Sequence, residues 1–123
     1  MIYLRKAIMR KLKEYHSSVY FEQSPEDTLF PYVVFTFPNS FTNEHQEIFV
    51  MDVDIWDNRE DTTDLETLSS TIWRGLNRYF YIDEHIQISV YRSNRLFDLE
   101  DNNPRIKRRK LIFEVKYFER ESD

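Results

Sequence analysis

The sequence predicts a single α+β domain, in which a mostly antiparallel sheet of about five strands carries two helices on one face. The 123 residues are the length of one domain with one core. Hydrophobic residues make up 41% of the chain and aromatic residues 16%, which is enough bulk for that core. Two segments with helical periodicity are separated by runs that alternate with a period of two, and consecutive strands favour antiparallel pairing. The predicted order is α-β-β-β-α-β-β.

The first helix is predicted over Tyr3–Tyr15. Leu4, Ile8 and Leu12 recur every four residues and form one apolar stripe. The segment is basic, but it has neither an uninterrupted apolar stretch nor a cleavage site of small residues. We therefore interpret it as a helix of the domain and not as a signal peptide.

Two strands are expected next. Val19–Phe21 is a short apolar run, and Tyr32–Phe37 is a β-branched and aromatic run bracketed by Pro31 and Pro38. Proline cannot donate a hydrogen bond to a β-ladder, so the two prolines are expected to set the limits of the second strand. A polar loop is predicted over Asn39–Gln46.

Residues 47–68 predict a long strand, an acidic turn and a second helix. Ile48–Trp56 alternates strictly, with Phe49 and its i+2 partners on one face and Asp52 and Asp54 on the other. Thr63 and Glu66 have the spacing of a capping box, so a helix is expected from Asp64 to about Tyr79. Leu65, Leu68, Ile72, Leu76 and Tyr79 form its buried stripe, which Trp73 and Phe80 extend.

The last two strands are predicted over Ile86–Tyr91 and Lys110–Phe118, and residues 119–123 are expected to fray. Between the strands, Arg92–Arg105 is a charged connection in which Leu96, Phe97 and Leu99 are candidates for contact with another chain. The single glycine, Gly75, falls inside the second helix. The turns are therefore expected to rely on Asn, Asp and Pro.

The charge is distributed unevenly. The chain carries a formal net charge of −5, yet residues 22–66 contain twelve acids against one base, Arg59, which is a net −11. Both ends are basic. Such polarity favours self-association or docking to a charged protein partner.

Several classes of site are excluded by composition. The chain has no cysteine, which excludes cysteine-based zinc sites and cysteine nucleophiles. A single glycine excludes the phosphate-binding and dinucleotide-binding loops, which need several. His16, His45 and His85 lie far apart in the sequence and show no metal-ligand spacing. No cofactor is predicted.

The aspartates of residues 52–61 are the candidate acidic surface: Asp52, Asp54, Asp57 and Asp61. Hard cations take several carboxylate oxygens, and Asp52 with Asp54 could also act as the acid and base of a hydrolase. However, no glycine follows at the EF-hand position, and an acid near a helix N-terminus is explained by the helix dipole. We favour a structural or surface role over a metal site, and a metal site over catalysis.

The candidate basic surface is the RIKRRK run: Arg105, Lys107, Arg108, Arg109 and Lys110. Basic clusters bind phosphates, but the acidity of the rest of the chain weakens a nucleic-acid interpretation. Lys107 and Arg109 share the strand face of Leu111, so the cluster is expected to divide across the sheet. Pairing of this run with the acidic turn of a neighbouring subunit uses both charge anomalies together.

Three stretches that follow the first helix carry a family resemblance: VYFEQSPEDTLFPYVVFTFPNS, VMDVDIWDNREDTTDLETL and RRKLIFEVKYFER. Together they resemble the tail terminator proteins of long-tailed bacteriophages and prophages, also called tail completion or tail-to-head joining proteins. The resemblance covers Leu4 to Arg120, and DIWDNREDTT is its most particular part.

The resemblance implies a two-helix, one-sheet structural subunit without enzymatic activity. In that family the subunits form a hexameric ring that caps the finished tail tube and faces the head connector, at the head–tail junction of the virion. The implied partners are other copies of the chain, the major tail tube protein, the connector or stopper, and DNA in transient passage. Isolated subunits can remain monomers, synthesis in the cytoplasm of the bacterial host is implied, and no membrane is involved.

Two alternatives remain open at this stage. One is another small neck or head-completion component of the virion, a stopper or an adaptor. The other is a metal-dependent hydrolase that uses Asp52, Asp54 and Asp57.

Overall fold

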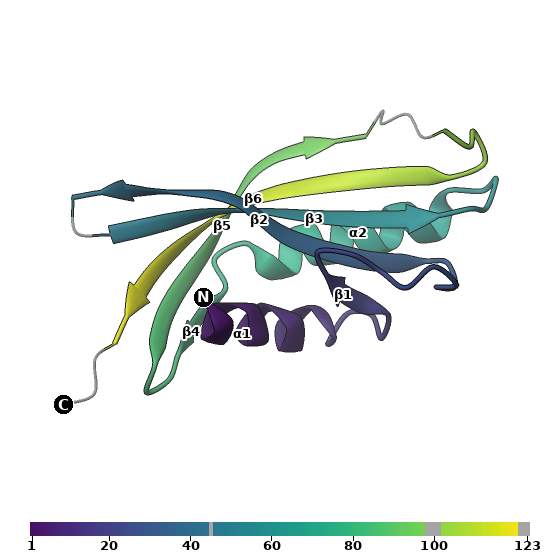
Figure 1. Cartoon of the computed structure of the whole chain (residues 1–123). Coiled ribbons are helices and arrows are strands. Elements are labelled where there is room, and N and C mark those ends of the chain that lie inside the picture. The colour runs from purple at the N-terminus through teal and green to yellow at the C-terminus, as the bar shows by residue number, and fades with distance from the viewer. Residues whose placement is uncertain (45, 98–101, 121–123) are drawn as a thin grey trace.

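The computed structural model describes residues 1–44, 46–97 and 102–120 (Figure 1). They form two helices and six strands: α1 (Ile2–Leu12), β1 (Val19–Phe21), β2 (Tyr32–Asn43), β3 (Gln46–Asp57), α2 (Thr63–Leu76), β4 (Phe80–Ile82), β5 (Ile86–Leu96) and β6 (Lys107–Glu119). The predicted α+β class and the predicted order of elements are confirmed. The sheet has six strands, because the short strand β4 follows α2.

The sheet has the strand order β1-β2-β3-β6-β5-β4. Only β1 and β2 pair in parallel among these neighbours, and every other pair is antiparallel. Both helices lie on the same side of the sheet (Figure 1). We call the helix-covered side the inner face and the opposite side, on which the described residues place no helix, the outer face.

The core lies between the helices and the inner face. Phe49, Met51, Val53 and Ile55 of β3 are all buried, as their alternation predicts. Phe35 of β2 and Phe113 of β6 are the largest fully buried side chains. The stripe residues Leu4, Ile8 and Leu12 of α1, and Leu65, Ile72 and Leu76 of α2, belong to the same cluster.

Gly75 lies where the turn after α1 meets α2. A Cβ atom at this position would lie 2.1 Å from Oη and 2.5 Å from Cζ of Tyr15. Glycine is unfavourable inside a helix, so the reason for it here is the close approach of the Tyr15 ring. Tyr15 packs against the core from this place.

Strand β2 continues past Pro38, contrary to the prediction of a loop over Asn39–Gln46. Asn39–Asn43 pairs with residues 46–50 of β3, and the register shifts between Thr36 and Asn39. A bulge is one of the few places where a strand accepts proline, because the ladder is interrupted there. Pro38 therefore marks an irregularity within the strand and not its end. His45 lies outside the described residues.

The last two strands are also longer than predicted. β5 runs to Leu96 through a register shift between Arg92 and Asn94, so the predicted connection is partly strand. β6 begins at Lys107 and includes Glu119, which pairs with Ile86. The backbone N–H of Arg120 donates to the His85 carbonyl at 2.8 Å, so Glu119 and Arg120 are held in the fold, contrary to the fraying predicted from residue 119. Leu99 and residues 121–123 lie outside the described part.

The predicted capping box at the start of α2 is wrong. Thr62 is the N-cap residue, and it makes no side-chain hydrogen bond to the helix. Asp61 Oδ1 instead accepts hydrogen bonds from N and Oγ1 of Thr63, at 2.9 and 2.6 Å. Glu66 does not reach back to the helix start, because its carboxylate binds Arg109.

Helix α2 ends at Leu76, earlier than the predicted Tyr79. The next residue is extended, and Arg78 has a φ of 65°, in the left-handed region that ends a helix. Glu22 and Glu44 are the other described residues with positive φ. The prediction that Asn, Asp and Pro supply the turn geometry is wrong at these three positions, where longer charged residues take it.

Asp83 organises the β4–β5 turn. Its carboxylate accepts hydrogen bonds from Tyr81 Oη at 2.7 Å and from the backbone N–H groups of His85 and Ile86 at 2.7 and 2.9 Å. Donation by Tyr81 and by these amides lowers the pKa of Asp83 to about 2. The ionised carboxylate is therefore the form that the folded protein prefers.

We expect Asp83→Ala to lower the free energy of unfolding at neutral pH. Because the folded pKa lies below the ordinary value of 3.8, the contribution of Asp83 is fully present above about pH 4 and is lost as the pH falls toward 2. Urea unfolding of the two proteins between pH 7 and pH 2 measures this. A difference between them that stays constant over that range would contradict the assignment.

None of the described helices is long and apolar enough to cross a membrane.

Candidate functional site

The acidic strand and the basic run are neighbours in the sheet. β3 and β6 pair antiparallel, with Asp54 opposite Lys110 and Trp56 opposite Arg108. Asp52 lies two residues along β3 from Asp54 and shares its face. These side chains lie on the outer face, so four of the nine predicted surface residues are brought together there.

Lys110 is the centre of this outer-face network. Its Nζ lies 3.2 Å from Asp52 Oδ2 and 3.6 Å from Asp54 Oδ2. Arg108 Nε lies 3.6 Å from Asp54 Oδ1. The acidic and basic segments therefore neutralise each other within one chain, and their pairing between neighbouring subunits stays a prediction.

Asp54 is the most buried member of the network, with 7% of its surface exposed. Burial raises the pKa of Asp54, while the charges of Lys110 and Arg108 oppose that rise. Asp54 Oδ1 and Arg108 Nε have no hydrogen-bond partner among the described residues and face each other just beyond hydrogen-bond distance. The charged form of Asp54 is therefore stabilised mainly by Lys110 and Arg108.

Aromatic rings border the network at the edge nearest β2. Tyr32 stacks on Trp56 with ring centroids 5.3 Å apart, and the Arg108 guanidinium lies 5.5 Å from the Trp56 ring. A ring that covers a guanidinium limits its contact with water and adds a cation–π attraction. This end of the outer face therefore consists of aromatic rings and of acidic and basic side chains that pair with one another.

Arg109 lies on the inner side, as the predicted division of the basic cluster requires. Its Nε donates to the Glu66 carboxylate of α2, and its Nη1 donates to the Phe97 carbonyl at 3.2 Å. Arg109 therefore ties α2 and the end of β5 to β6, which is a structural role.

Asp57 and Asp61 do not join Asp52 and Asp54. Asp57 is 1% exposed; its Oδ1 accepts a hydrogen bond from Asn58 N at 2.9 Å, and its Oδ2 lies 3.4 Å from Arg59 Nε. Arg59 also pairs with Asp64, and so links the end of β3 to the first turn of α2. The hydrogen bonds from Thr63 lower the pKa of Asp61. Both acids thus organise the turn before α2.

The two remaining basic residues line a shallow depression. Arg105 and Lys107 lie with Asn58 and Glu60 around a space of about 310 Å³. Lys107 Nζ donates to the Pro104 carbonyl at 3.3 Å. Glu60 places a negative charge in the lining, which lowers the affinity of the depression for anions.

The described residues contain no group of three or more His, Cys, Asp or Glu side chains that could hold a metal ion. His16 Nε2 lies 2.8 Å from the Pro31 carbonyl, and the His85 ring stacks on Tyr3 with centroids 3.9 Å apart. Both rings therefore pack against other parts of the fold.

Exposed apolar side chains lie at the other end of the outer face. They are Phe80, Ile82, Tyr91 and Phe118, which are 38–54% exposed, and the strand register sets Gln87 between Ile82 and Phe118. Sequence reasoning missed this group because it placed Phe80 in the second helix. The available signal was the alternation along β6, which puts Phe118 on the same face as Lys110.

No protein-family model matches the chain, and no curated protein matches it. The likeness to tail terminators therefore depends on the sequence motifs.

Proposed function

We propose that this protein is a structural subunit of a phage or prophage virion, which caps the tail tube and joins the tail to the head connector as part of a ring. The observation that carries the proposal is the outer face of the sheet, on which the described part of the chain places no helix, combined with the family resemblance of the sequence. That face presents the exposed apolar side chains of Phe80, Ile82, Tyr91 and Phe118, which are available for contact with a partner.

The charge arrangement supports a structural role. Asp52 and Asp54 are each paired with Lys110, and Asp57 is buried beside Arg59. Their positions are explained by the cohesion of the sheet and of the turn before α2, so the proposal needs no reaction at these carboxylates. In the proposed ring, DNA passes without specific binding. The compensated network would offer the DNA little net charge of either sign.

The proposal predicts the phenotype of a particle that lacks this protein. We expect electron microscopy to show tails that are overlong or not joined to heads, because the tube has no cap and the connector has no partner. Restoration of the gene should restore joined particles. Empty heads with tails of normal length would instead identify a neck stopper or adaptor, and normal particles would contradict a virion role.

A further inference from the structure

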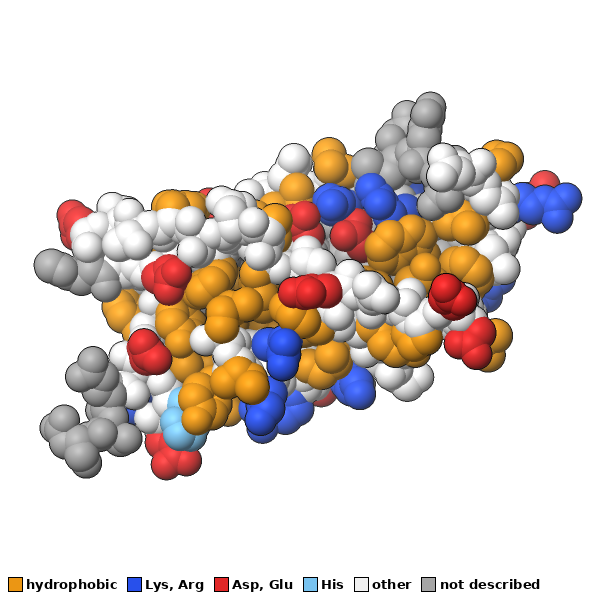
Figure 2. All heavy atoms as spheres, in the orientation of Figure 1, with side chains coloured by type: hydrophobic (Ala, Val, Ile, Leu, Met, Phe, Trp, Pro, Cys, Tyr) orange, Lys and Arg blue, Asp and Glu red, His pale blue; other side chains and the backbone are white. Residues whose placement is uncertain are grey.

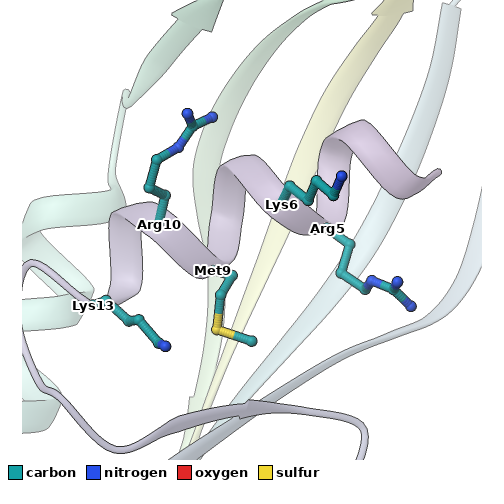
Figure 3. Close-up of a pocket in the computed structure, with 5 residues that line it drawn as sticks. All are labelled: Arg5, Lys6, Met9, Arg10 and Lys13. Atoms are coloured by element: carbon teal, nitrogen blue, oxygen red, sulfur yellow. The ribbon is translucent and has the colours of Figure 1, made fainter.

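Helix α1 carries a cationic groove on its exposed side, formed by Arg5, Lys6, Met9, Arg10 and Lys13. The groove has a volume of about 260 Å³. Figure 3 shows Met9 projecting between Lys13 and Arg5, with Arg10 on the opposite side of the helix. In the space-filling view, basic side chains gather on the surface over α1 (Figure 2). The groove thus has an apolar floor surrounded by cations.

These cations have no acidic partner among the residues that the structure describes. The Arg5 guanidinium lies 5.0 Å from the Phe21 ring, and Arg10 Nη2 donates to Tyr81 Oη at 3.0 Å. Both interactions position a guanidinium without neutralising it. Lys6 and Lys13 are exposed and make no ion pair there. Like charges on successive turns of one helix repel each other, and an acidic partner would relieve that repulsion.

A projection of opposite charge is present in the same chain. We call the end of the β2–β3 hairpin, the described residues 38–44 with 46 and 47, the arm. Residues 38–44 are all exposed, and Figure 1 shows the hairpin extending beyond both helices. The arm carries Glu44 and Glu47 and no cation. A projection that packs so little against its own core is available to a neighbouring molecule.

One face of the arm is suited to the groove. Thr42 pairs with Glu47, and Ser40 Oγ donates to Glu47 Oε2 at 2.9 Å, so these side chains lie together. Asn43 points to the opposite face, because successive strand residues alternate. Asp61, by contrast, is held in the turn before α2 by hydrogen bonds from Thr63 and does not project in this way.

We propose that the cationic groove of α1 binds the acidic arm of a second copy of this chain. The inference rests on the proposed function, in which copies of the chain form a ring. Groove and arm are different surfaces, so their contact is heterologous, and it closes into a ring when the rotation between successive copies permits. The proposal assigns the face by which successive subunits join: Glu44 and Glu47 enter among the cations, with Met9 beneath them.

Cross-linking tests the contact directly, because the chain has no cysteine of its own. We expect Met9→Cys protein and Thr42→Cys protein to form a disulfide-linked heterodimer when they are mixed at high concentration under mild oxidation. Asn43→Cys is the matched control, since it lies one residue away on the other face of the arm. Lys13→Cys replaces Met9→Cys if the latter is poorly folded. Equal yields from Thr42→Cys and Asn43→Cys would overturn the proposal.

Charge reversal gives an independent measurement. We expect Lys6→Glu/Lys13→Glu and Glu44→Lys/Glu47→Lys each to weaken self-association about tenfold or more in sedimentation at low salt, a ratio that corresponds to about 1.4 kcal/mol. A mixture of the two reversed proteins should associate again, because each supplies the charge that the other lost. Failure of the mixture to associate, or retention of the wild-type affinity by either variant alone, would overturn the arm–groove contact.

The two proposals fail in different ways. If the reversed variants still join tails to heads while the deletion does not, the arm–groove contact is wrong and the tail-joining function stands. If the deletion leaves particles normal while cross-linking succeeds, the contact stands and the virion role is wrong. If the α1 reversal abolishes binding to a DNA duplex but leaves association unchanged, the groove binds phosphates and the proposed occupant is wrong.

Discussion

Truncation of Phe113 to alanine is expected to lower the free energy of unfolding by about 3–5 kcal/mol, the range for a fully buried phenylalanine. Phe113 lies in the middle of β6 and is 0% exposed, and its ring lies 5.4 Å from the Trp73 ring of α2. Removal of the ring loses the contact between sheet and helix and leaves a cavity that the neighbouring strands cannot close. Such a loss is a large part of the about 5–15 kcal/mol that holds a domain folded.

The measurement is equilibrium unfolding in urea, with Phe118→Ala as the matched control. Phe118 is on the same strand, but its side chain lies on the outer face and is 42% exposed. We expect the control to change the stability by about 0.5 kcal/mol or less, as exposed substitutions usually do. Comparable losses in the two variants would mean that β6 does not present Phe113 to the core.

The second large effect is expected at Lys110. Lys110→Met should lower the free energy of unfolding by about 2 kcal/mol at neutral pH, somewhat less than the loss for a completely buried pair. The change removes the ion pairs at 3.2 and 3.6 Å to Asp52 and Asp54 and leaves Asp54 with Arg108 alone. Lys116→Met is the control, since Lys116 lies on the same strand face over the Tyr91 ring and makes no ion pair among the described residues.

The pH dependence of the Lys110→Met effect has a definite sign. Lys110 holds down the already raised pKa of Asp54, so its removal raises that pKa further. A folded pKa above the unfolded value means that the charged carboxylate costs stability above about pH 4, and that this cost disappears on protonation. The deficit of Lys110→Met should therefore shrink as the pH falls toward 3.8, the ordinary value for the carboxyl group. A deficit that grows on acidification would contradict the role of Asp54.

The elements with a continuous apolar pattern could be predicted from the sequence. The stripe of α1, the three residues of β1 and the inner face of β3 were all predicted, because most side chains there belong to the core or pack against it. The short strand β4 was not predicted, because three residues are too few to show an alternating pattern and because the helical spacing of apolar residues continued into Phe80. The left-handed backbone conformation of Arg78 ends helix α2 before β4 begins. Arginine rarely adopts this conformation, so its presence in the sequence does not predict it.

Strand ends that project from the core were predicted poorly for a related reason. Residues 39–43 and 92–96 are exposed on both faces over most of their length, so no buried side imposes alternation on them. Their strand structure comes from backbone pairing with β3 and β6, which side chains alone do not report. Pro38, at the irregularity in β2, was mistaken for an end because a regular ladder was assumed.

The candidate residues were identified by charge, but their partners could not be. Asp54 and Lys110 are 56 positions apart in the sequence, and their pairing depends on the register between two strands that are separated by three other elements. Only the division of the basic cluster across the sheet followed from local alternation. Likewise, Thr63 and Glu66 had the capping spacing, and the competing attraction of Arg109 for Glu66 became visible only when β6 was placed beside α2.

The approach of Tyr15 to Gly75 couples two positions that are distant in the sequence. A methyl group at residue 75 would occupy space that the Tyr15 ring now fills, so a change at one position is acceptable only if the other changes with it. Substitution of a glycine by alanine stabilises most helices. At position 75 it would instead force the Tyr15 ring out of its place between the turn and α2. In any natural relative with alanine at position 75, a smaller residue is accordingly to be expected at position 15.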